Sequence, residues 1–332
     1  MTSALLTGVA LSAVHESWPL DKPFTISRGS KTHADVVVVR LGKDGVTGQG
    51  ECVPYPRYDE TVPQVLAALE TARRNIEASL SFGSIPLLGL PHAAQNALDC
   101  ALWDLRCKQE GKPAWAIAGL AEPRPLTTAY TISLGDAAEM ARAAADANRP
   151  LLKLKLGKPG DAERLHAIRD AVPGTRLIVD ANEGWSADVL PAMLRACRDT
   201  GVELVEQPLP AGHDEELKGM SRDCLICADE SAHGLDSLPD LVGKYDAINI
   251  KLDKTGGLTP ALALAHAARD KGFVIMVGCM VGTSLGMAPA TLVGQLAQVV
   301  DLDGPLLLRK DRDPGIRFEG SIMHPPPREL WG

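Results

Sequence analysis

The sequence predicts an α/β protein in which a parallel (β/α) barrel follows a smaller α+β domain. The chain has 332 residues, which is more than one small core requires. From Leu126 onward, short apolar runs alternate with helical stretches. Charged residues close five successive apolar runs at intervals of 22 to 26 residues, about one strand, one helix and two short loops. These residues are Lys155, Asp180, Glu206, Asp229 and Lys251.

The N-terminal part shows strand patterns followed by helical patterns, without a βα repeat. Strands are expected over 6–14, 34–41 and 46–52, and apolar spacing over Ala94–Leu105 predicts a helix. Prolines at 123 and 125 mark the change of pattern. The tail contains Pro314 and three prolines at 325–327, so it is not a barrel helix. We therefore expect a first domain over 1–120, a barrel over 121–310, and a tail over 311–332 that returns to the first domain.

Eight strands of similar spacing predict the barrel, which would lack its last helix. They are expected over 127–132, 151–156, 177–181, 203–206, 225–229, 247–251, 273–277 and about 298–302, with helices such as 162–171 and 260–271 between them. Residues 272–300 carry no charge, but they include five glycines and Pro289. A buried strand, a glycine loop and a helix explain this stretch better than a membrane span.

Bulk composition excludes several classes of partner. A net charge of −8 argues against a general nucleic-acid binder, and no membrane association is expected. Seven cysteines form no paired framework, which is typical of reduced thiols in a cytoplasmic protein. No Lys or Arg precedes Lys22, so the positive region of a signal peptide is missing. The sequence is compatible with a homo-oligomer and does not decide the oligomeric state.

Strand alternation points the charged residues into the barrel. Lys153 and Lys155 share one face of their strand, while the neighbouring leucines share the other and would face the helices. Asp180 and Asn182 likewise share a face. Inward charges are costly unless they are paired or bound to a metal.

Three acids on adjacent strands form a candidate metal site. Asp180, Glu206 and Asp229 offer oxygen ligands without His or Cys, a set that favours Mg²⁺ or Mn²⁺ over Zn²⁺. Each acid alone would be read as a cap of the following helix. Three acids in register, between inward lysines, favour the metal.

Lys155 and Lys251 fall on opposite sides of these acids, which suggests two bases that invert one stereocentre. A lysine acts as a base when its pKa is lowered, and Lys153 would have that effect on Lys155. A metal would stabilise the enediolate formed from a carboxylate substrate. The alternative is that each lysine forms an interior salt bridge. Near the end of the eighth strand, Asp301 and Asp303 would bind a substrate ammonium or, equally well on spacing, cap a loop.

The motifs together resemble the enolase superfamily, muconate-lactonizing subgroup, and most closely its dipeptide epimerases. The resemblance rests on K-x-K at 153–155, VDAN, EQP, ADES, NIKLDKTGG around Lys251 and QNALDCALWDL at 95–105. The segment GECVPYPRY at 50–58, GCM at 278–280 and DLDG at 301–304 make it more specific. It spans nearly the whole chain.

The resemblance implies a modified (β/α)7β TIM-type barrel with an N-terminal α+β capping domain. It implies that the three acids bind Mg²⁺, with Mn²⁺ as a substitute, that Lys155 and Lys251 are the acid/base pair, and that Lys153 assists Lys155. The metal would also hold the substrate α-carboxylate. Asp301 or Asp303 would hold the ammonium and Arg28 a glutamate side chain. Further implied contacts are Tyr55 and Cys279 to the substrate, and Asn182 and Glu230 in support of the metal ligands.

The activity implied is epimerisation of the C-terminal residue of a dipeptide, L-Ala-L-Glu to L-Ala-D-Glu, in recycling of murein peptides. Alternatives within the superfamily are another dipeptide specificity or an N-acylamino-acid racemase. The Asp-x-Asp pair favours a free amine, because an N-acyl group offers no cation. Alternatives outside it are a Schiff-base lysine aldolase, which needs no metal, and a catalytically silent barrel.

Overall fold

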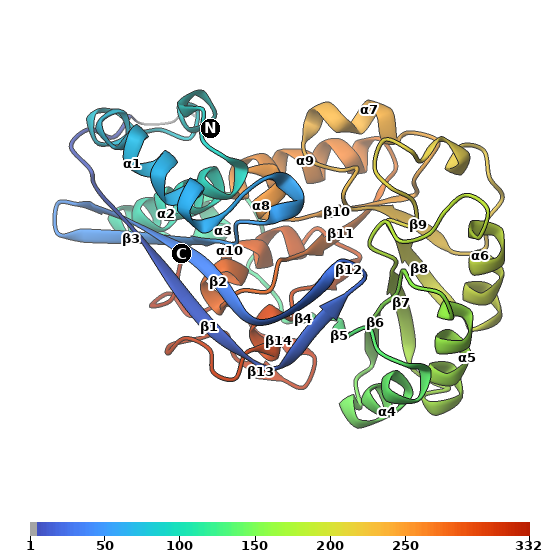
Figure 1. Cartoon of the computed structure of the whole chain (residues 1–332). Coiled ribbons are helices and arrows are strands. Elements are labelled where there is room, and N and C mark those ends of the chain that lie inside the picture. The colour runs from blue at the N-terminus through green and yellow to red at the C-terminus, as the bar shows by residue number, and fades with distance from the viewer. Residues whose placement is uncertain (1–4) are drawn as a thin grey trace.

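The computed structural model describes residues 5–332, and Figure 1 shows a barrel with a smaller domain at its side. The smaller domain contains the antiparallel strands β1 (Ala10–Ile26), β2 (Gly29–Lys43) and β3 (Val46–Cys52). Helices α1 (Val62–Ala78), α2 (His92–Glu110) and α3 (Ala114–Ile117) follow, with 3₁₀ turns η1 (Pro56–Tyr58) and η2 (Ile85–Leu88). A Cβ on Gly50 would lie 2.2 Å from the carbonyl oxygen of Ala97. Glycine in β3 therefore lets α2 pack directly on the sheet.

Eight parallel strands form the barrel in chain order. They are β5 (Tyr130–Ile132), β6 (Leu151–Lys155), β7 (Arg176–Asp180), β8 (Val202–Glu206), β9 (Leu225–Ala228), β10 (Ala247–Ile250), β11 (Val274–Gly278) and β12 (Val299–Asp301). The expected strand 127–132 is wrong in one respect, because residues 128–129 interrupt it. Its first part, β4 (Leu126–Thr127), pairs with β14 (Ile322–Met323), which also pairs with β13 (Phe318–Glu319).

Hydrogen bonds outside the regular ladder connect the first and last barrel strands. The Ala129 N–H donates to the Val300 carbonyl oxygen over 2.8 Å, and the Leu302 N–H donates to the Thr128 hydroxyl over 2.8 Å. The interruption at 128–129 thus supplies the contacts that bring β5 against β12. The eight strands and the adjoining antiparallel domain confirm the predicted fold class.

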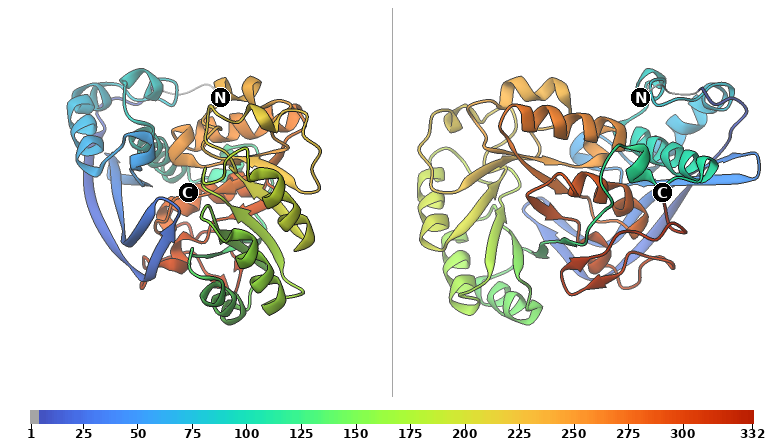
Figure 2. Two further views of the ribbon diagram at one scale, coloured as in Figure 1. Left: turned by 45° about the vertical axis from the view of Figure 1, so that its right-hand side comes forward. Right: turned by 180° about the vertical axis from the view of Figure 1, so that it is seen from behind.

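The helices lie outside the strands, as the additional views show (Figure 2). They are α4 (Ala137–Ala147), α5 (Asp161–Ala171), α6 (Leu190–Asp199), α7 (Leu238–Leu241), α8 (Leu252–Thr255), α9 (Leu258–Asp270) and α10 (Ser284–Gly294), with 3₁₀ turns η3 (Glu215–Leu217), η4 (Leu235–Ser237) and η5 (Gly304–Leu307). Between β8 and β9 the chain forms η3 in place of an α-helix. In the described part of the chain no α-helix follows β12, as expected.

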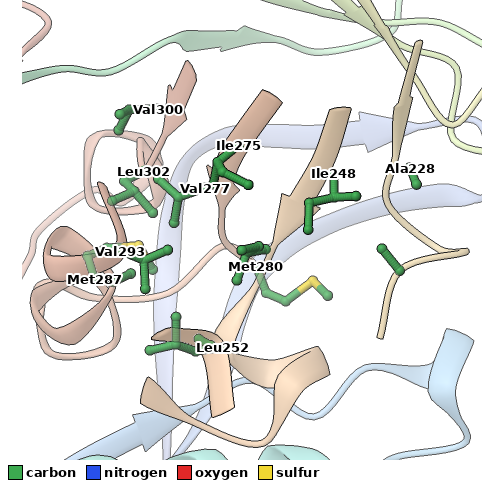
Figure 3. Packing of buried hydrophobic residues seen from close by; sticks show 14 of the residues in the cluster. Ala228, Ile248, Leu252, Ile275, Val277, Met280, Met287, Val293, Val300 and Leu302 are labelled. Carbon is green, nitrogen blue, oxygen red and sulfur yellow. The ribbon is translucent and has the colours of Figure 1, made fainter. Parts of the chain in front are cut away.

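Two apolar layers explain why the polar groups gather at one end of the barrel. The outer layer packs strand residues such as Ile248 and Val277 against the helices (Figure 3). The interior layer contains Leu151, Ile178 and Leu204, among others, and fills one end of the barrel. Since alternate residues of β6 point inward, Lys153 and Lys155 follow Leu151 toward the carboxyl ends of the strands.

The C-terminal tail contacts the N-terminal elements. The Trp331 indole donates to the Cys100 carbonyl oxygen over 2.9 Å, and the Ala114 N–H donates to the Gly332 carbonyl oxygen over 3.0 Å. These contacts agree with a returning tail, while the division at residues 120 and 310 stays a prediction. In the stretch 5–332, every helix is too short or too polar to cross a membrane.

Candidate active site

The ends of β7, β8 and β9 bring three carboxylates together. Asp180 ends β7 and Glu206 ends β8, and the two residues are direct partners in the register. Asp229 follows β9. One carboxylate oxygen of each residue lies within 4.8 Å of the others, and all three side chains are buried. The three predicted acids therefore form a pocket with the spacing of a metal site.

Two lysines lie at opposite ends of this acid cluster. Lys155 Nζ is 2.6 Å from Asp180 Oδ2, and Lys251 Nζ is 2.6 Å from Asp229 Oδ2. Glu206 lies between them, 3.8 Å from Lys251 Nζ. The sequence therefore placed the two candidate bases correctly on either side of the acids. The interior salt bridges that were the alternative explanation for each lysine are present as well.

Lys153 lies in the barrel interior, where its amine contacts three carboxylates. Its Nζ is 2.6 Å from Glu206 Oε2, 2.7 Å from Asp301 Oδ2 and 3.4 Å from Asp180 Oδ2. Burial opposes the charge of Lys153, but these ion pairs outweigh burial and hold its pKa well above the usual value. Lys153 is thus a protonated cation at the centre of the acid cluster.

The pKa values of Asp180, Asp229 and Lys251 reflect the same pairing. Burial alone would raise the pKa of Asp229 and lower that of Lys251, but their mutual ion pair reverses both effects. Burial also opposes the charge of Asp180, yet Lys155 and Lys153 hold its pKa below the ordinary value. Lys251 therefore keeps its proton in this state, because its amine pairs with the carboxylate that a metal would share.

The oxygen atoms around the acids fit a hard divalent cation. Asn182 donates to both oxygens of Asp180, from its N–H over 2.9 Å and from Nδ2 over 3.1 Å, and so fixes that carboxylate. Asn249 Nδ2 donates to Glu206 Oε1 over 2.7 Å. The side-chain oxygens of Asn182 and Asn249, one of Glu230 and one of Asp301 are buried and accept no hydrogen bond within the described chain. An all-oxygen set with unsatisfied acceptors beside it suits Mg²⁺ or Mn²⁺.

A cavity of about 670 Å³ lies over the acids, between the barrel and the smaller domain. Its lining includes Lys155, Lys251 and Asp229 from the barrel, and Arg28 and Tyr55 from loops of the smaller domain. Asn182, Glu230 and Cys279, which were also predicted to lie at the site, line the cavity as well. The Cys279 thiol is not ionised, because burial raises its pKa. The volume is adequate for a small molecule such as a dipeptide.

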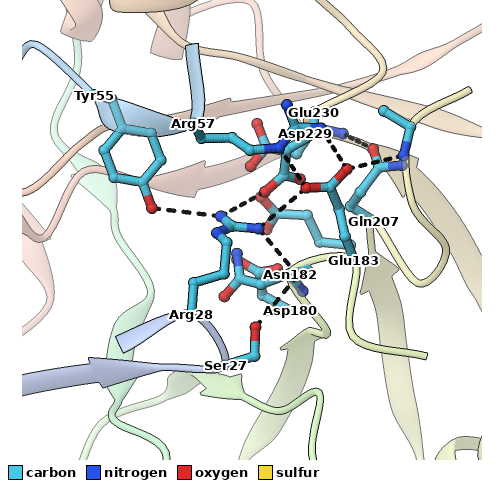
Figure 4. Close-up of polar contacts among 12 residues, drawn as sticks. Ser27, Arg28, Tyr55, Arg57, Asp180, Asn182, Glu183, Gln207, Asp229 and Glu230 are labelled. Carbon is cyan, nitrogen blue, oxygen red and sulfur yellow. Dashed lines mark hydrogen bonds and ion pairs between the residues drawn. The ribbon is translucent and has the colours of Figure 1, made fainter. Parts of the chain in front are cut away.

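Arg28 reaches the cavity, but protein groups already engage its guanidinium (Figure 4). Its Nη2 is 2.8 Å from Glu230 Oε1 and 3.4 Å from the Tyr55 hydroxyl. Its Nη1 is 3.0 Å from the Asn182 carbonyl oxygen and 3.3 Å from Glu183 Oε2. Its charge is therefore shared with two acids before any ligand arrives.

Asp301 and Asp303 are both buried, and each has a structural partner. Asp301 Oδ2 pairs with Lys153, while its Oδ1 remains without a partner among residues 5–332. Asp303 Oδ2 accepts from the Thr131 N–H over 2.7 Å, so it helps to hold β5 against β12. Burial and the charge of Asp301 raise the pKa of Asp303 to about 7. Neither residue is part of the cavity lining.

Two lysines at the site were missed from the sequence. Lys254 Nζ lies 2.6 Å from Asp229 Oδ1 and 2.9 Å from the Asn249 carbonyl oxygen. Strand alternation does not place it, because β10 ends at Ile250 and a helical turn begins at Leu252. Lys31 lines the cavity from β2 and forms no ion pair with any residue of 5–332. Burial lowers its pKa to about 8.

Phe24 lies between two cavity amines. Lys31 Nζ and Lys155 Nζ each lie 5.8 Å from the centroid of its ring. The ring also lines the cavity. Phe24 therefore contributes an apolar, weakly cation-attracting surface beside the candidate base.

Comparison with known proteins agrees with this geometry. The enolase C-terminal domain-like family matches residues 136–328, and the mandelate racemase/muconate lactonizing enzyme N-terminal domain matches residues 9–119. The L-Ala-D/L-Glu epimerase of Escherichia coli K12 is 44% identical over 312 residues, which cover 93% of this chain and 97% of that protein. An N-acetyl-D-glutamate racemase from a Pseudoalteromonas species is 42% identical, with coverage of 90% and 95%.

Solved structures extend the comparison to bound ligands. An enolase family member from Agrobacterium tumefaciens, with homology to dipeptide epimerases, is 51% identical with a TM-score of 0.95. The match covers 98% of this chain and 100% of that one, whose structure contains sodium and L-Ala-L-Glu. The L-Ala-D/L-Glu epimerase of Bacillus subtilis, in a complex with substrate, is 29% identical with a TM-score of 0.92 and coverage of 98% of both chains. The chain belongs to the mandelate racemase/muconate lactonizing enzyme family of the enolase superfamily, as its motifs indicated, and its relatives are epimerases and racemases of amino-acid derivatives.

Proposed function

We propose that this protein is a metal-dependent epimerase of dipeptides that end in glutamate, with L-Ala-L-Glu and L-Ala-D-Glu as its substrate pair. The observation that carries the proposal is the pair of amines at opposite ends of three buried carboxylates, beneath a cavity. Amines on both sides of one bound carbon can remove a proton from one side and return it on the other. The Escherichia coli and Bacillus subtilis relatives that carry this activity supply the choice of dipeptide.

The residues of this chain divide the work between proton transfer and positioning. Lys155 and Lys251 would be the acid/base pair, and Lys153 would balance the charge of Glu206 and Asp301. Asp180, Glu206 and Asp229 would hold Mg²⁺ or Mn²⁺. When bound, the cation would offset the negative charge that develops on the substrate carboxylate. Asn182 would keep Asp180 in its ligand orientation.

The glutamate side chain would bind Lys31 more readily than Arg28. Lys31 lines the cavity and has no acidic partner among the residues that the structure describes, whereas Arg28 is paired with Glu230 and Glu183. A half-buried cation without an ion-pair partner gains more from a substrate carboxylate than one that must exchange partners. Arg28 as the glutamate ligand stays a prediction, and Lys31→Met compared with Arg28→Met on Ala-Glu and Ala-Leu would decide between the two.

Proton NMR of L-Ala-L-Glu with the enzyme and Mg²⁺ in D₂O tests the proposal. We expect the glutamate α-proton signal to disappear while the L-Ala-D-Glu diastereomer accumulates. EDTA should stop both changes. No exchange with any Ala-Glu diastereomer in the presence of Mg²⁺ would refute the proposed substrate.

A second candidate is racemisation of an N-acylated glutamate, and the state of Asp301 and Asp303 favours it. In these residues, which would hold the ammonium of a dipeptide, Lys153 already engages Asp301 Oδ2 and the Thr131 N–H engages Asp303 Oδ2, and neither residue is part of the cavity lining. An N-acetyl-D-glutamate racemase is also among the relatives. N-Acetyl-L-glutamate in the same NMR assay separates the two candidates, since the ratio of the two kcat/KM values reports the preferred N-terminal group.

The cellular context belongs to the same proposal. An enzyme that interconverts L-Ala-D-Glu and L-Ala-L-Glu would act in the cytoplasm on peptides released from murein. Seven cysteines without a disulfide are compatible with that compartment. Accumulation of L-Ala-D-Glu in cells that lack the protein would support this role, and unchanged dipeptide levels would refute it.

A further inference from the structure

We propose that Glu183 is a positioning residue that holds two loops of the smaller domain closed over the cavity. The inference rests on the proposed function for its kinetic consequence, but the contacts are independent of the substrate. Glu183 lies on the barrel, three residues after the end of β7, and its side chain is 11% exposed. Figure 4 shows it beneath Arg57 and beside Arg28, which come from different loops of the smaller domain.

One carboxylate connects three separate segments. Arg57 donates to Glu183 through two bonds of 2.7 Å, from Nε to Oε2 and from Nη2 to Oε1. Arg28 Nη1 donates to Oε2 over 3.3 Å. The Ala211 N–H, from the loop after β8, donates to Oε1 over 2.9 Å. Paired bonds between Arg and a carboxylate fix direction as well as distance, so Glu183 fixes the loop that contains Arg57.

The backbone at Glu183 is held in an unusual conformation that aims the side chain at these loops. Asn182 and Glu183 have φ values of 47° and 62°, in the left-handed region that non-glycine residues rarely occupy. The Glu183 N–H donates to the Gln207 carbonyl oxygen over 2.9 Å, and Gly184 packs so closely on Gly157 that a Cβ would lie 2.4 Å from its Cα. A tightly packed turn on the barrel thus presents the carboxylate to the two loops.

The two loops depend on Glu183 to different degrees. Within residues 5–332, Arg57 pairs with Glu183 alone, whereas Arg28 also contacts Asn182, Tyr55 and Glu230. The Arg57 loop carries Tyr55 and Tyr58, which line the cavity. Loss of the carboxylate should therefore free the segment 55–60 strongly and the segment 24–31 weakly.

This asymmetry predicts a specific kinetic result. Substrate binding needs the loops in place, so a smaller closed population raises the apparent KM, while saturating substrate restores closure. We expect Glu183→Gln to raise KM for L-Ala-L-Glu about tenfold and to change kcat less than about twofold, since charge-assisted pairs of this partial exposure are of that strength. Product release from a looser cavity would not slow turnover.

Hydrogen exchange of the full-length protein gives a readout that needs no substrate. Amides of 55–60 should exchange about tenfold faster in Glu183→Gln, and those of 24–31 less than that. Arg57→Gln is a second variant that removes one contact, and it should accelerate 55–60 alone. Glu203→Gln is the matched control, because Glu203 forms a similar pair with Arg176 at the amino ends of β7 and β8, far from the loops. Arg176 donates from Nε to Oε1 over 2.9 Å and from Nη2 to Oε2 over 2.7 Å.

Each outcome decides the proposal. Unchanged exchange at 55–60 in both loop variants would overturn it, as would a fall in kcat with KM unchanged, or equal acceleration in Glu203→Gln. If Glu183→Gln does not fold, Arg57→Gln decides by exchange at 55–60. If the enzyme does not turn over Ala-Glu, only the kinetic test is lost. Hydrogen exchange that still accelerates as expected would then support the role of Glu183, while the absent turnover would refute the proposed function.

Discussion

Replacement of Lys153 by Met should test whether the acid cluster is held together by charge. The side chain of Lys153 is 2% exposed, and its amine contacts Glu206, Asp301 and Asp180 within 3.4 Å. Met retains most of the apolar stem but leaves these carboxylates without their common cation. Removal of one partner from a buried ion pair costs about 3–5 kcal/mol. We therefore expect Lys153→Met to lower the free energy of unfolding by about that amount in EDTA.

Urea unfolding monitored by tryptophan fluorescence, in EDTA and in excess Mg²⁺, measures this effect. Mg²⁺ at 100 times the wild-type Kd should stabilise the wild type by about 2.7 kcal/mol. The same Mg²⁺ concentration should stabilise the variant more, because the amine that competes with the metal for the carboxylates is gone. Lys112→Met is the control, since Lys112 forms an exposed pair 3.6 Å from Glu110 and should change stability by less than about 0.5 kcal/mol.

Two results would refute the reasoning. A loss below about 1 kcal/mol in EDTA would mean that solvent or protonation already neutralises the acids in the absence of Lys153. A failure of Mg²⁺ to stabilise the wild type would mean that the three acids do not form a metal site. Equal losses in EDTA and in Mg²⁺ would show that Lys153 and the cation do not share carboxylates.

Three further predictions concern catalysis, the substrate amine and pH. Lys155→Ala and Lys251→Ala should each lower epimerisation at least about 10²-fold in the NMR assay, with exchange of one enantiomer retained, and full activity in both would reject the two-base mechanism. Asp303→Asn should lower kcat/KM for L-Ala-L-Glu and for N-acetyl-L-glutamate by similar factors, because the Asp303 carboxylate holds the Thr131 N–H outside the cavity lining, and a larger loss for the dipeptide would assign Asp303 the ammonium role. Burial raises the pKa of Asp99 to about 7, so between about pH 4 and 7 the folded state holds a proton that the unfolded chain releases, and stability falls as pH rises. Asn at position 99 can still accept from the Thr259 N–H, so Asp99→Asn should make the pH-dependent loss of unfolding free energy smaller by between about 1 and 4 kcal/mol. Urea unfolding of both proteins from about pH 4 to 7 measures this difference, and parallel stability curves for variant and wild type would contradict the raised pKa of Asp99.

Strand alternation accounts for what could be predicted of the site. The period of two in β6 placed Lys153 and Lys155 inside, and equal spacing placed Asp180, Glu206 and Asp229 on one rim, because parallel strands end on the same face. Strand alternation makes no prediction for residues beyond the end of a strand. Lys254 follows the end of β10 by four residues, so only the helical turn that starts at Leu252 brings its amine to Asp229.

Contacts between the two domains could not be predicted in the same way. Arg28 meets Glu230 across 202 positions of sequence, and Arg57 meets Glu183 across 126. No local pattern encodes such pairs, so the sequence could not show that Arg28 is already engaged or that Lys31 is free. The interruption of the first barrel strand has the same origin, because Ala129 and Thr128 bond to residues more than 170 positions away.

The charge balance at the barrel mouth connects these observations. Four lysines (153, 155, 251 and 254) and four carboxylates (180, 206, 229 and 301) are buried in mutual contact, so their charges cancel when all eight groups are ionised. Without a metal, burial and the charge of Asp180 raise the pKa of Glu206 to about 8, so that carboxyl is the one that retains a proton. Near neutrality explains how so many ionised groups remain buried. A divalent cation added to this set, with one of the two basic lysines deprotonated, would leave an excess of one positive charge, which would favour a substrate of net negative charge such as a dipeptide with two carboxylates and one ammonium. Lys31, which lines the cavity and forms no ion pair within the described part of the chain, adds to the same preference. In the proposed function, the site would therefore favour glutamate by its summed charge as well as by a single contact, and neutralisation of Lys31 alone should weaken that preference without abolishing it.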